Sequence, residues 1–204
     1  MPAVAYVLQR YPVLSQTFVH AELVALRRRG VDVSVVTHEV GDPAVRFGDG
    51  PDGVPLAPAH VGLHGAAAAL RRFDHVHGHF ADFGVRVLAP LAEAAGRPFS
   101  FTAHAYDLFR RDAAVTVDEW RCLSSRLRRV VTISRFHQEF LVRRGVPAAK
   151  VAVIPNAAAL ARLFAVAPAA PTSLRRVLAV GRPVAKKGFG VLVQAWALAR
   201  TMVP

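Results

Sequence analysis

A histidine and an aspartate three positions apart form the most promising chemical pair in the sequence. They are His104 and Asp107, and they follow the run FSFTA at 99–103, which has the length and composition of a buried strand. A histidine titrates near neutral pH and can donate or accept a hydrogen bond, so the pair can meet a polar substrate. The alternative is that His104 only caps the following helix, but its place after a strand favours a functional role.

Two cations, Arg182 and Lys187, stand in the run GRPVAKKG at 181–188, between an apolar stretch and a helical one. Cations beside a helix N-terminus suit a phosphate group. The run matches neither a P-loop nor a dinucleotide-binding glycine motif. Taken alone, such a loop is more often a solvated turn.

Three histidines, His75, His77 and His79, alternate along a predicted strand and therefore share one face. This spacing raises the question of a metal. The motif HxHxDH would require Asp at 81 and His at 82, where Ala81 and Asp82 stand instead. We therefore predict no metal site.

The polar residues Ser15, Gln16 and Thr17 stand where the first predicted helix begins. Small hydroxyl side chains there leave the helix N-terminus facing an anion or a sugar. A plain N-cap fits these residues at least as well.

Elements that would position these residues alternate along the chain. The patterns predict strands at 3–8, 31–37, 75–80, 99–103, 130–133 and 151–154, and helices at 17–29, 66–72 and 83–95, with a kink at Pro90. They also predict a C-cap at Gly30, a capping box at Thr116–Glu119, an N-cap at Ser134 and an exposed loop at 41–58. Such alternation implies an α/β fold, a mostly parallel sheet covered on both faces, which binds ligands at the carboxyl ends of its strands.

The domain organisation changes near residue 165. Residues 1–164 read as a complete α/β domain, and the Ala- and Pro-rich stretch 165–176 reads as a linker. Residues 177–204 read as a strand at 177–180 followed by a loop and a helix. One such unit cannot bury its own faces, so the chain looks like a whole first domain attached to the incomplete start of a second.

Composition and charge limit the class of protein. The chain has 204 residues, 53% hydrophobic and 20% charged, which is typical of a globular protein. Its net charge of +12 arises in residues 101–204, because residues 1–100 are balanced. The asymmetry indicates a polyanionic partner, although the Arg- and Ala-rich composition that GC-rich codon usage produces explains it equally well. Signatures of nucleic-acid binding are not found.

The single cysteine, Cys122, and the lack of a signal peptide or an uninterrupted apolar span predict a cytoplasmic protein. Trp120, Leu123 and Leu127 alternate with arginines, which suggests a basic amphipathic helix in peripheral contact with anionic lipid at the inner face of the membrane. The alternative is a helix that packs Trp120 inward.

The motifs together resemble one family, the family-4 retaining glycosyltransferases, and most closely the colanic acid and amylovoran type that builds exopolysaccharide. The resemblance is carried by YVLxxYPxLSQTF at 6–18, HGHFA at 77–81, FSFTAHAYDLF at 99–109, VTIS at 131–134, VIPN at 153–156 and VGR through KKGF at 180–189. It implies the GT-B fold, in which two Rossmann-like domains face each other across a cleft. The implied reaction moves a hexosyl group from a nucleotide-sugar donor to a glycan or lipid-linked glycan.

The resemblance also implies roles for single residues. Arg182 and Lys187 would neutralise the leaving donor diphosphate, so that no metal or other cofactor is required. His104 would contact the donor sugar, with Asp107 supporting its loop, and both are expected to be catalytic. Ser15, Gln16, Thr17 and His79 would line the cleft. The alternative function is a basic, non-catalytic module that binds anionic membrane or nucleic acid.

The chain departs from the family pattern in three places. Ala157 stands where the family usually has Gly, and Pro183 and Ala185 stand where it usually has Leu and Glu. The family's paired carboxylates, which hold the donor ribose and sugar, lie beyond the point that the sequence reaches. We therefore expect the 204 residues alone to be inactive.

Overall fold

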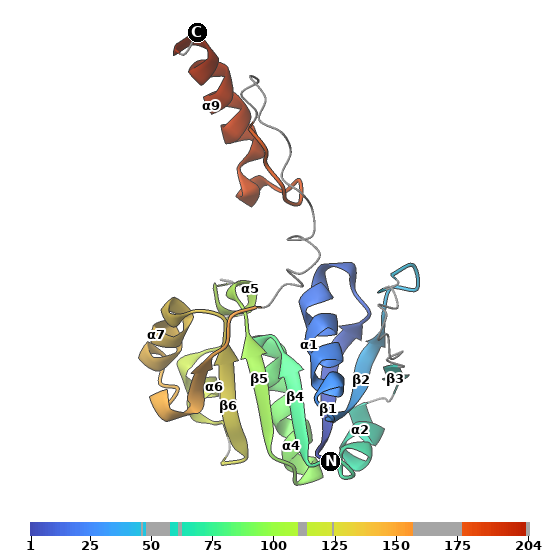
Figure 1. The fold of residues 1–204 in the computed structure, drawn as a ribbon. Helices are drawn as coiled ribbons and strands as arrows, with labels where there is room; N and C mark the ends of the chain where they lie inside the picture. The colour runs from blue at the N-terminus through green and yellow to red at the C-terminus, as the bar shows by residue number, and fades with distance from the viewer. Residues whose placement is uncertain are drawn as a thin grey trace. The chain divides into compact units, whose positions relative to one another are not determined.

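A seven-stranded parallel sheet organises the first part of the protein in the computed structural model (Figure 1). The structure describes residues 1–45, 47, 58–60, 63–109, 114–123, 125–156 and 177–202. The strands are β1 (Ala3–Tyr11), β2 (Asp32–Val40), β3 (Pro58–His60), β4 (His75–His79), β5 (Phe99–Ala103), β6 (Leu127–Thr132) and β7 (Val151–Val153). Their order is β3-β2-β1-β4-β5-β6-β7, so the chain winds outward from β1 in both directions.

Helices connect these strands. They are α1 (Thr17–Arg28), α2 (Leu63–Leu70), α3 (Ala81–Phe83), α4 (Ala89–Ala95), α5 (Ala105–Phe109), α6 (Val117–Arg121) and α7 (Arg135–Arg143), with α9 (Phe189–Met202) near the C-terminus. Short 3₁₀ turns occur at Leu14–Gln16, Ala148–Lys150 and Ala185–Lys187. No helix among the described residues is long and apolar enough to cross a membrane.

Both faces of the sheet are covered, as the strand–helix alternation predicts. Along β1, Ala5 and Val7 pack into the larger apolar cluster, which includes residues of α2, α3, α4 and α6. The intervening Tyr6 and Leu8 pack into a second cluster with Val19 of α1. Successive strand residues point to opposite faces, so this alternation buries both sides of β1.

The helical stretch from α3 to α4 packs very closely on β5. A Cβ added to Gly84 would lie 2.5 Å from the ring of Phe101, so only a residue without a side chain fits there. Residues Gly84–Leu88 form a π-helical turn, in which the N–H of Ala89 donates to the carbonyl of Gly84. A wider turn therefore precedes Pro90, where the sequence predicted a kink.

Three of the predicted helix caps are confirmed. The Ser134 hydroxyl accepts the N–H of His137 at 3.3 Å and starts α7. Thr116 and Glu119 form a reciprocal capping box at the start of α6. Gly30, with φ of 78°, follows the end of α1 in the left-handed conformation that glycine favours.

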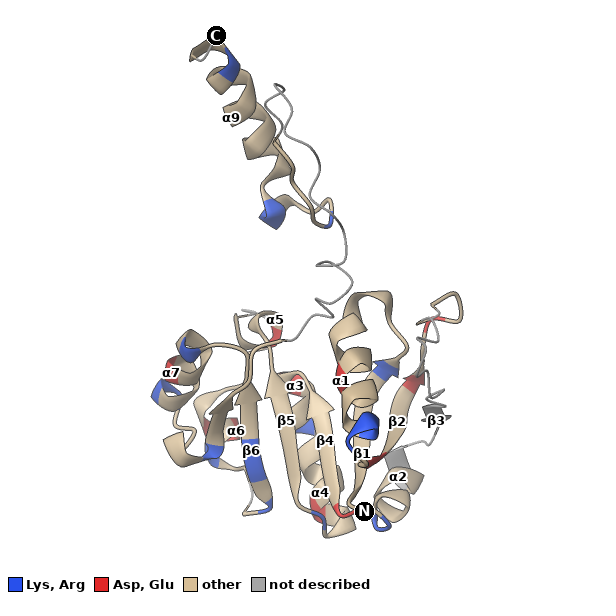
Figure 2. Cartoon of the chain, in the orientation of Figure 1, with Lys and Arg blue, Asp and Glu red and all other residues tan. Residues whose placement is uncertain are grey.

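The predicted basic amphipathic helix is wrong. Helix α6 ends at Arg121, and Leu127 already belongs to strand β6, which pairs with β5 and β7. Because β6 pairs with a strand on each side, the extended conformation is favoured here over the helix that the spacing of apolar residues suggested. Trp120 is 3% exposed, so the alternative in which it packs inward is the correct one. Arginines of this region lie on β6 and α7 (Figure 2).

The chain divides into two units, residues 1–160 and 161–204. The strand predicted at 177–180 does not form, because a strand requires a partner and the described residues of the second unit offer none. The helix predicted after it does form, as α9. The predicted linker 165–176 lies outside the described residues, as does most of the predicted loop 41–58.

Candidate functional site

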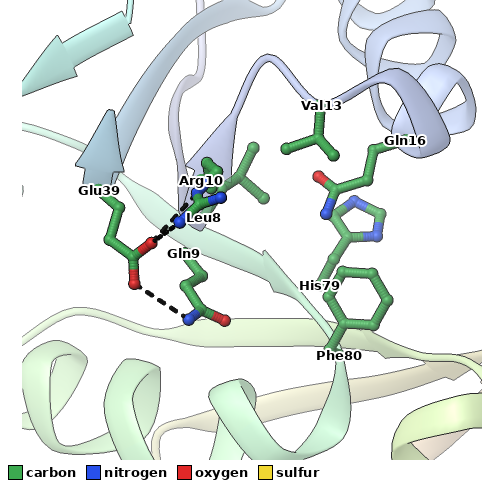
Figure 3. A pocket seen from close by; sticks show the side chains of 8 residues that line it. All are labelled: Leu8, Gln9, Arg10, Val13, Gln16, Glu39, His79 and Phe80. Carbon is green, nitrogen blue, oxygen red and sulfur yellow. Dashed lines mark hydrogen bonds and ion pairs between the residues drawn. The ribbon is translucent and has the colours of Figure 1, made fainter. Parts of the chain in front are cut away.

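A hollow of about 320 Å³ lies where β1, β2 and β4 end (Figure 3). Its walls combine amide, charged, imidazole and apolar groups. The lining residues are Leu8, Gln9, Arg10, Val13, Gln16, Glu39, His79 and Phe80. Because carboxyl ends of parallel strands are the usual ligand-binding edge of this fold, the hollow is the candidate binding pocket of the first unit.

The charges in this pocket cancel. The Nε of Arg10 donates to Glu39 at 3.1 Å, and the side-chain amide of Gln9 donates to the same carboxylate at 3.2 Å. The hydrogen bonds from Arg10 and then Gln9 lower the pKa of Glu39, so this carboxyl is ionised and paired. The pocket therefore presents hydrogen-bonding groups without a net charge.

Two histidines meet at the edge of this pocket. The Nδ1 of His79, at the end of β4, lies 3.1 Å from the Nε2 of His104, just beyond β5. Their rings are nearly parallel, with centroids 5.4 Å apart. Because β4 and β5 are parallel neighbours, residues that follow their carboxyl ends are brought together. The sequence indicated each histidine but not their contact.

Both histidines are neutral near pH 7. Burial, followed by the charge of His137, lowers the pKa of His104 to about 4. Burial lowers the pKa of His79 well below its ordinary range. Each ring therefore carries one proton and can donate one hydrogen bond and accept another.

Asp107 holds the backbone next to the two histidines in place through hydrogen bonds. Its carboxylate is 1% exposed and accepts the backbone N–H groups of Ala81 and of His104, the latter at 3.0 Å. Burial is the main cause that raises its pKa to about 6. Asp107 thus ties the end of β4 to the end of β5, and the structure makes it a positioning residue for the two histidines.

Phe80 is a candidate site residue that the sequence analysis did not single out. It is the only non-glycine residue with positive φ among those described, at 73°, and its ring centroid lies 5.1 Å from that of His104. Its N–H donates to the carbonyl of Thr102 at 2.8 Å. A phenylalanine in this backbone region costs about 1–3 kcal/mol, which is typical of functional sites. No pattern in the sequence predicts a positive φ at Phe80.

Only two of the four residues predicted to line the cleft line this pocket. Gln16 and His79 both line the pocket (Figure 3). Ser15 and Thr17 are exposed at the start of α1 and do not line it. No side chain caps α1, so the plain N-cap interpretation is not supported.

Arg182 and Lys187 belong to the second unit and are exposed there. Lys187 ends the 3₁₀ turn Ala185–Lys187, and Gly188, with φ of 69°, connects that turn to α9. Two cations therefore precede a helix N-terminus, as the sequence indicated.

A metal could be held by the cluster of Glu22, His77 and His79, whose ligand atoms lie within 4.8 Å of one another. Both ring nitrogens of His77 are already hydrogen-bonded, to Ser100 at 2.7 Å and to Thr102 at 3.1 Å. Binding a metal would break one of these bonds. The absence of a metal site stays a prediction.

Comparisons with known proteins agree with this fold. Residues 15–162 match Glycosyltransferase Family 4. No curated protein matches the sequence significantly. Among solved structures, Anabaena Alr3699/HepE in complex with UDP is similar at 14% identity and a TM-score of 0.54, over 76% of this chain and 44% of that one. UDP-GlcNAc 2-epimerase from Methanocaldococcus jannaschii is similar at 13% identity and a TM-score of 0.53, over 76% and 46% of the two chains.

The structural likeness confirms the predicted Rossmann-like α/β fold class of the GT-B type. This chain spans less than half the length of those proteins. The family match covers well over half of the chain, and the chain therefore belongs to Glycosyltransferase Family 4.

Proposed function

We propose that the first unit of this chain is the acceptor-side part of an enzyme. This enzyme moves a hexosyl group from a nucleotide-sugar to a glycan, with retention of configuration. The family match supports glycosyl transfer. Similar solved structures include Alr3699/HepE in complex with UDP and in complex with UDP and glucose, which supports a nucleotide-sugar donor. The resemblance to colanic acid and amylovoran enzymes favours a lipid-linked acceptor in exopolysaccharide or cell-surface polysaccharide synthesis.

The pocket fits a neutral sugar of the acceptor. Its volume of about 320 Å³ falls at the lower end of the usual range for small-molecule sites, about 300–1,000 Å³. Gln9 and Gln16 both donate and accept hydrogen bonds, which is what sugar hydroxyls require, and Phe80 offers an apolar ring. Because Arg10 and Glu39 neutralise each other, an anionic acceptor unit gains nothing here.

The observation that carries the proposal is the contact of His79 with His104 at the edge of this pocket. A neutral imidazole can hold a sugar hydroxyl beside the reacting bond. Arg182 and Lys187 would stabilise the negative charge that develops on the departing diphosphate, which lowers the barrier without a metal.

We further propose a cytoplasmic location, because Cys122 is an exposed free thiol, as in a reducing compartment. Peripheral contact with anionic membrane remains a proposal, now without the amphipathic helix that first suggested it. We propose no nucleic-acid partner.

The test is a transfer assay on residues 1–160 joined to a complete donor-binding domain of the same family. Nucleoside diphosphate release is measured for a panel of nucleotide-sugars, with and without lipid-linked glycans. Acceptor-dependent release with an α-linked product from an α-linked donor is expected. Diphosphate release that does not depend on the acceptor, or a product with inverted anomeric configuration, would contradict the proposal. The 204 residues alone should release no diphosphate above background in the same assay.

A further inference from the structure

A carboxylate approaches the histidine pair from the far side of His79. Glu22, on α1, places its Oε2 at 3.6 Å from the Nε2 of His79. That nitrogen is buried and has no hydrogen-bond partner within the described part of the chain. The atoms therefore line up as a chain: carboxylate of Glu22, ring of His79, ring of His104.

The carboxylate itself is held in place. The hydroxyl of Tyr6 donates to Glu22 Oε1 at 2.6 Å, which leaves Oε2 facing His79. Burial and the neighbouring charge of Glu22 raise the pKa of Tyr6, so its hydroxyl keeps the proton that it donates. Burial raises the pKa of Glu22, and the hydrogen bond from Tyr6 counters this by favouring the carboxylate. The distance of 3.6 Å is longer than a hydrogen bond, so the carboxylate acts on His79 through its charge.

Only two proton arrangements satisfy the contact between two neutral histidines. In the first, His104 donates from Nε2, so His79 accepts at Nδ1 and carries its own proton on Nε2, pointing at Glu22. In the second, His79 donates from Nδ1 and turns the lone pair of Nε2 toward the carboxylate. A negative charge attracts an N–H and repels a lone pair, so Glu22 favours the first arrangement.

We propose that Glu22, acting through His79, fixes His104 as the tautomer that is protonated on Nε2 and free to accept a hydrogen bond on Nδ1. Glu22 and His79 are then positioning residues, and His104 is the group that meets substrate. That last step rests on the proposed function: a sugar hydroxyl would donate to Nδ1 of His104. The tautomer itself does not depend on the function.

Apart from His79 and Glu22, the groups around His104 do not determine its tautomer. Phe18 and Phe80 contact the ring of His104 with apolar faces, at centroid distances of 4.8 and 5.1 Å. Asp107 bonds to the backbone of His104. His77 and His137 also interact electrostatically with His104, and burial lowers the pKa of each of them, so neither adds a positive charge near pH 7.

Replacing Glu22 by glutamine reverses the preference. The amide oxygen can keep the hydrogen bond from Tyr6, and the NH₂ group then faces Nε2 of His79. A donor at that place favours the second arrangement, in which His104 is protonated on Nδ1. The substitution keeps the size of the side chain and changes only the sign of the group that faces His79.

The experiment is ¹⁵N NMR of the histidine rings in the whole 204-residue chain at pH 7. We expect a pyridine-like Nδ1 on His104 in the wild type, a pyrrole-like Nδ1 in Glu22→Gln, and the wild-type pattern restored in Glu22→Asp. Glu93→Gln, which removes a surface carboxylate paired with Arg126, should leave the pattern unchanged.

A wild-type chain with the proton on Nδ1 of His104 overturns the proposal, even if no variant folds. The same holds if Glu22→Gln folds and keeps the wild-type tautomer. The NMR experiment contains no substrate. The tautomer of His104 can therefore be confirmed even if the proposed transfer activity fails, and the activity can be confirmed even if the tautomer is wrong.

Discussion

The two sets of predicted functional residues lie in opposite surroundings. In the first unit, His104 and Asp107 are 7% and 1% exposed, and each has a hydrogen-bond partner in the sheet or in a neighbouring loop. In the second unit, Arg182 and Lys187 are exposed, and none of residues 177–202 is buried. Both regions carry motifs of the same family resemblance.

The difference shows what a parallel sheet contributes to a site. Burial lowers the pKa of both histidines of the pair and raises that of Asp107, so the first unit sets protonation and geometry before substrate binds. Arg182 and Lys187 are exposed, and solvent and salt weaken the electrostatic effect of exposed cations. The first unit is therefore an organised half-site.

Acid should destabilise the first unit strongly. Histidines with a lowered pKa stay neutral when folded, so between about pH 6.5 and 4 the unfolded chain binds more protons and stability falls as pH falls. Burial lowers the pKa of His77 to about 3 and that of His104 to about 4, and His79 is also lowered. Asp107, whose pKa is raised to about 6, opposes this, because it is more easily protonated when folded.

The expected net loss is about 2–3 kcal/mol of unfolding free energy per pH unit near pH 5.5. Urea unfolding at pH 7, 6 and 5.5 measures it. His104→Asn should reduce the slope by about 1 kcal/mol per pH unit. Equal stability at pH 7 and 5.5 would show that the histidines are not held neutral by the fold.

The same substitution should have opposite effects in the two units. Gly84→Ala forces a Cβ to 2.5 Å from the buried ring of Phe101 and should cost about 1–3 kcal/mol. Gly190→Ala, in α9, meets nothing within 4 Å and should raise helix content, with a gain of up to about 1 kcal/mol. Urea unfolding measures the first and circular dichroism the second. A loss of helix in Gly190→Ala would mean that α9 packs against something.

Backbone strain at the site should appear in a pair of variants at Phe80. Both Phe80→Ala and Phe80→Gly remove the ring next to His104, but only glycine adopts a φ of 73° without strain. We expect the glycine variant to be more stable than the alanine variant by about 1 kcal/mol in urea unfolding. An alanine variant of equal or greater stability would argue against strain.

The fold was largely predictable because its signals are local. Apolar β-branched runs located β1, β2 and β6, and hydroxyl side chains located the starts of α6 and α7. Strand β3 was not predicted, and two of the other errors share a cause. The strand at 177–180 and the helix around Trp120 both depend on which neighbours are present, and a local pattern does not contain that information.

The candidate site was predictable only in part. The positions of His79 near the end of one predicted strand and of His104 just after the next are visible in the sequence. Their contact, the approach of Glu22 from α1 and the positive φ of Phe80 are not, because each depends on the register of separate elements. Asp107 was found, but its burial gives it a supporting role.

The most direct test of the central claim is glycosyl transfer by residues 1–160 joined to a complete donor-binding domain, with His104→Ala compared with the wild type. We expect an unchanged fold and a transfer rate lower by on the order of 100-fold or more. His38→Ala, an exposed histidine of β2, serves as the matched control and should transfer at the wild-type rate. A His104→Ala enzyme within about twofold of wild type, well short of the 1.4 kcal/mol that a factor of ten represents, would contradict the account.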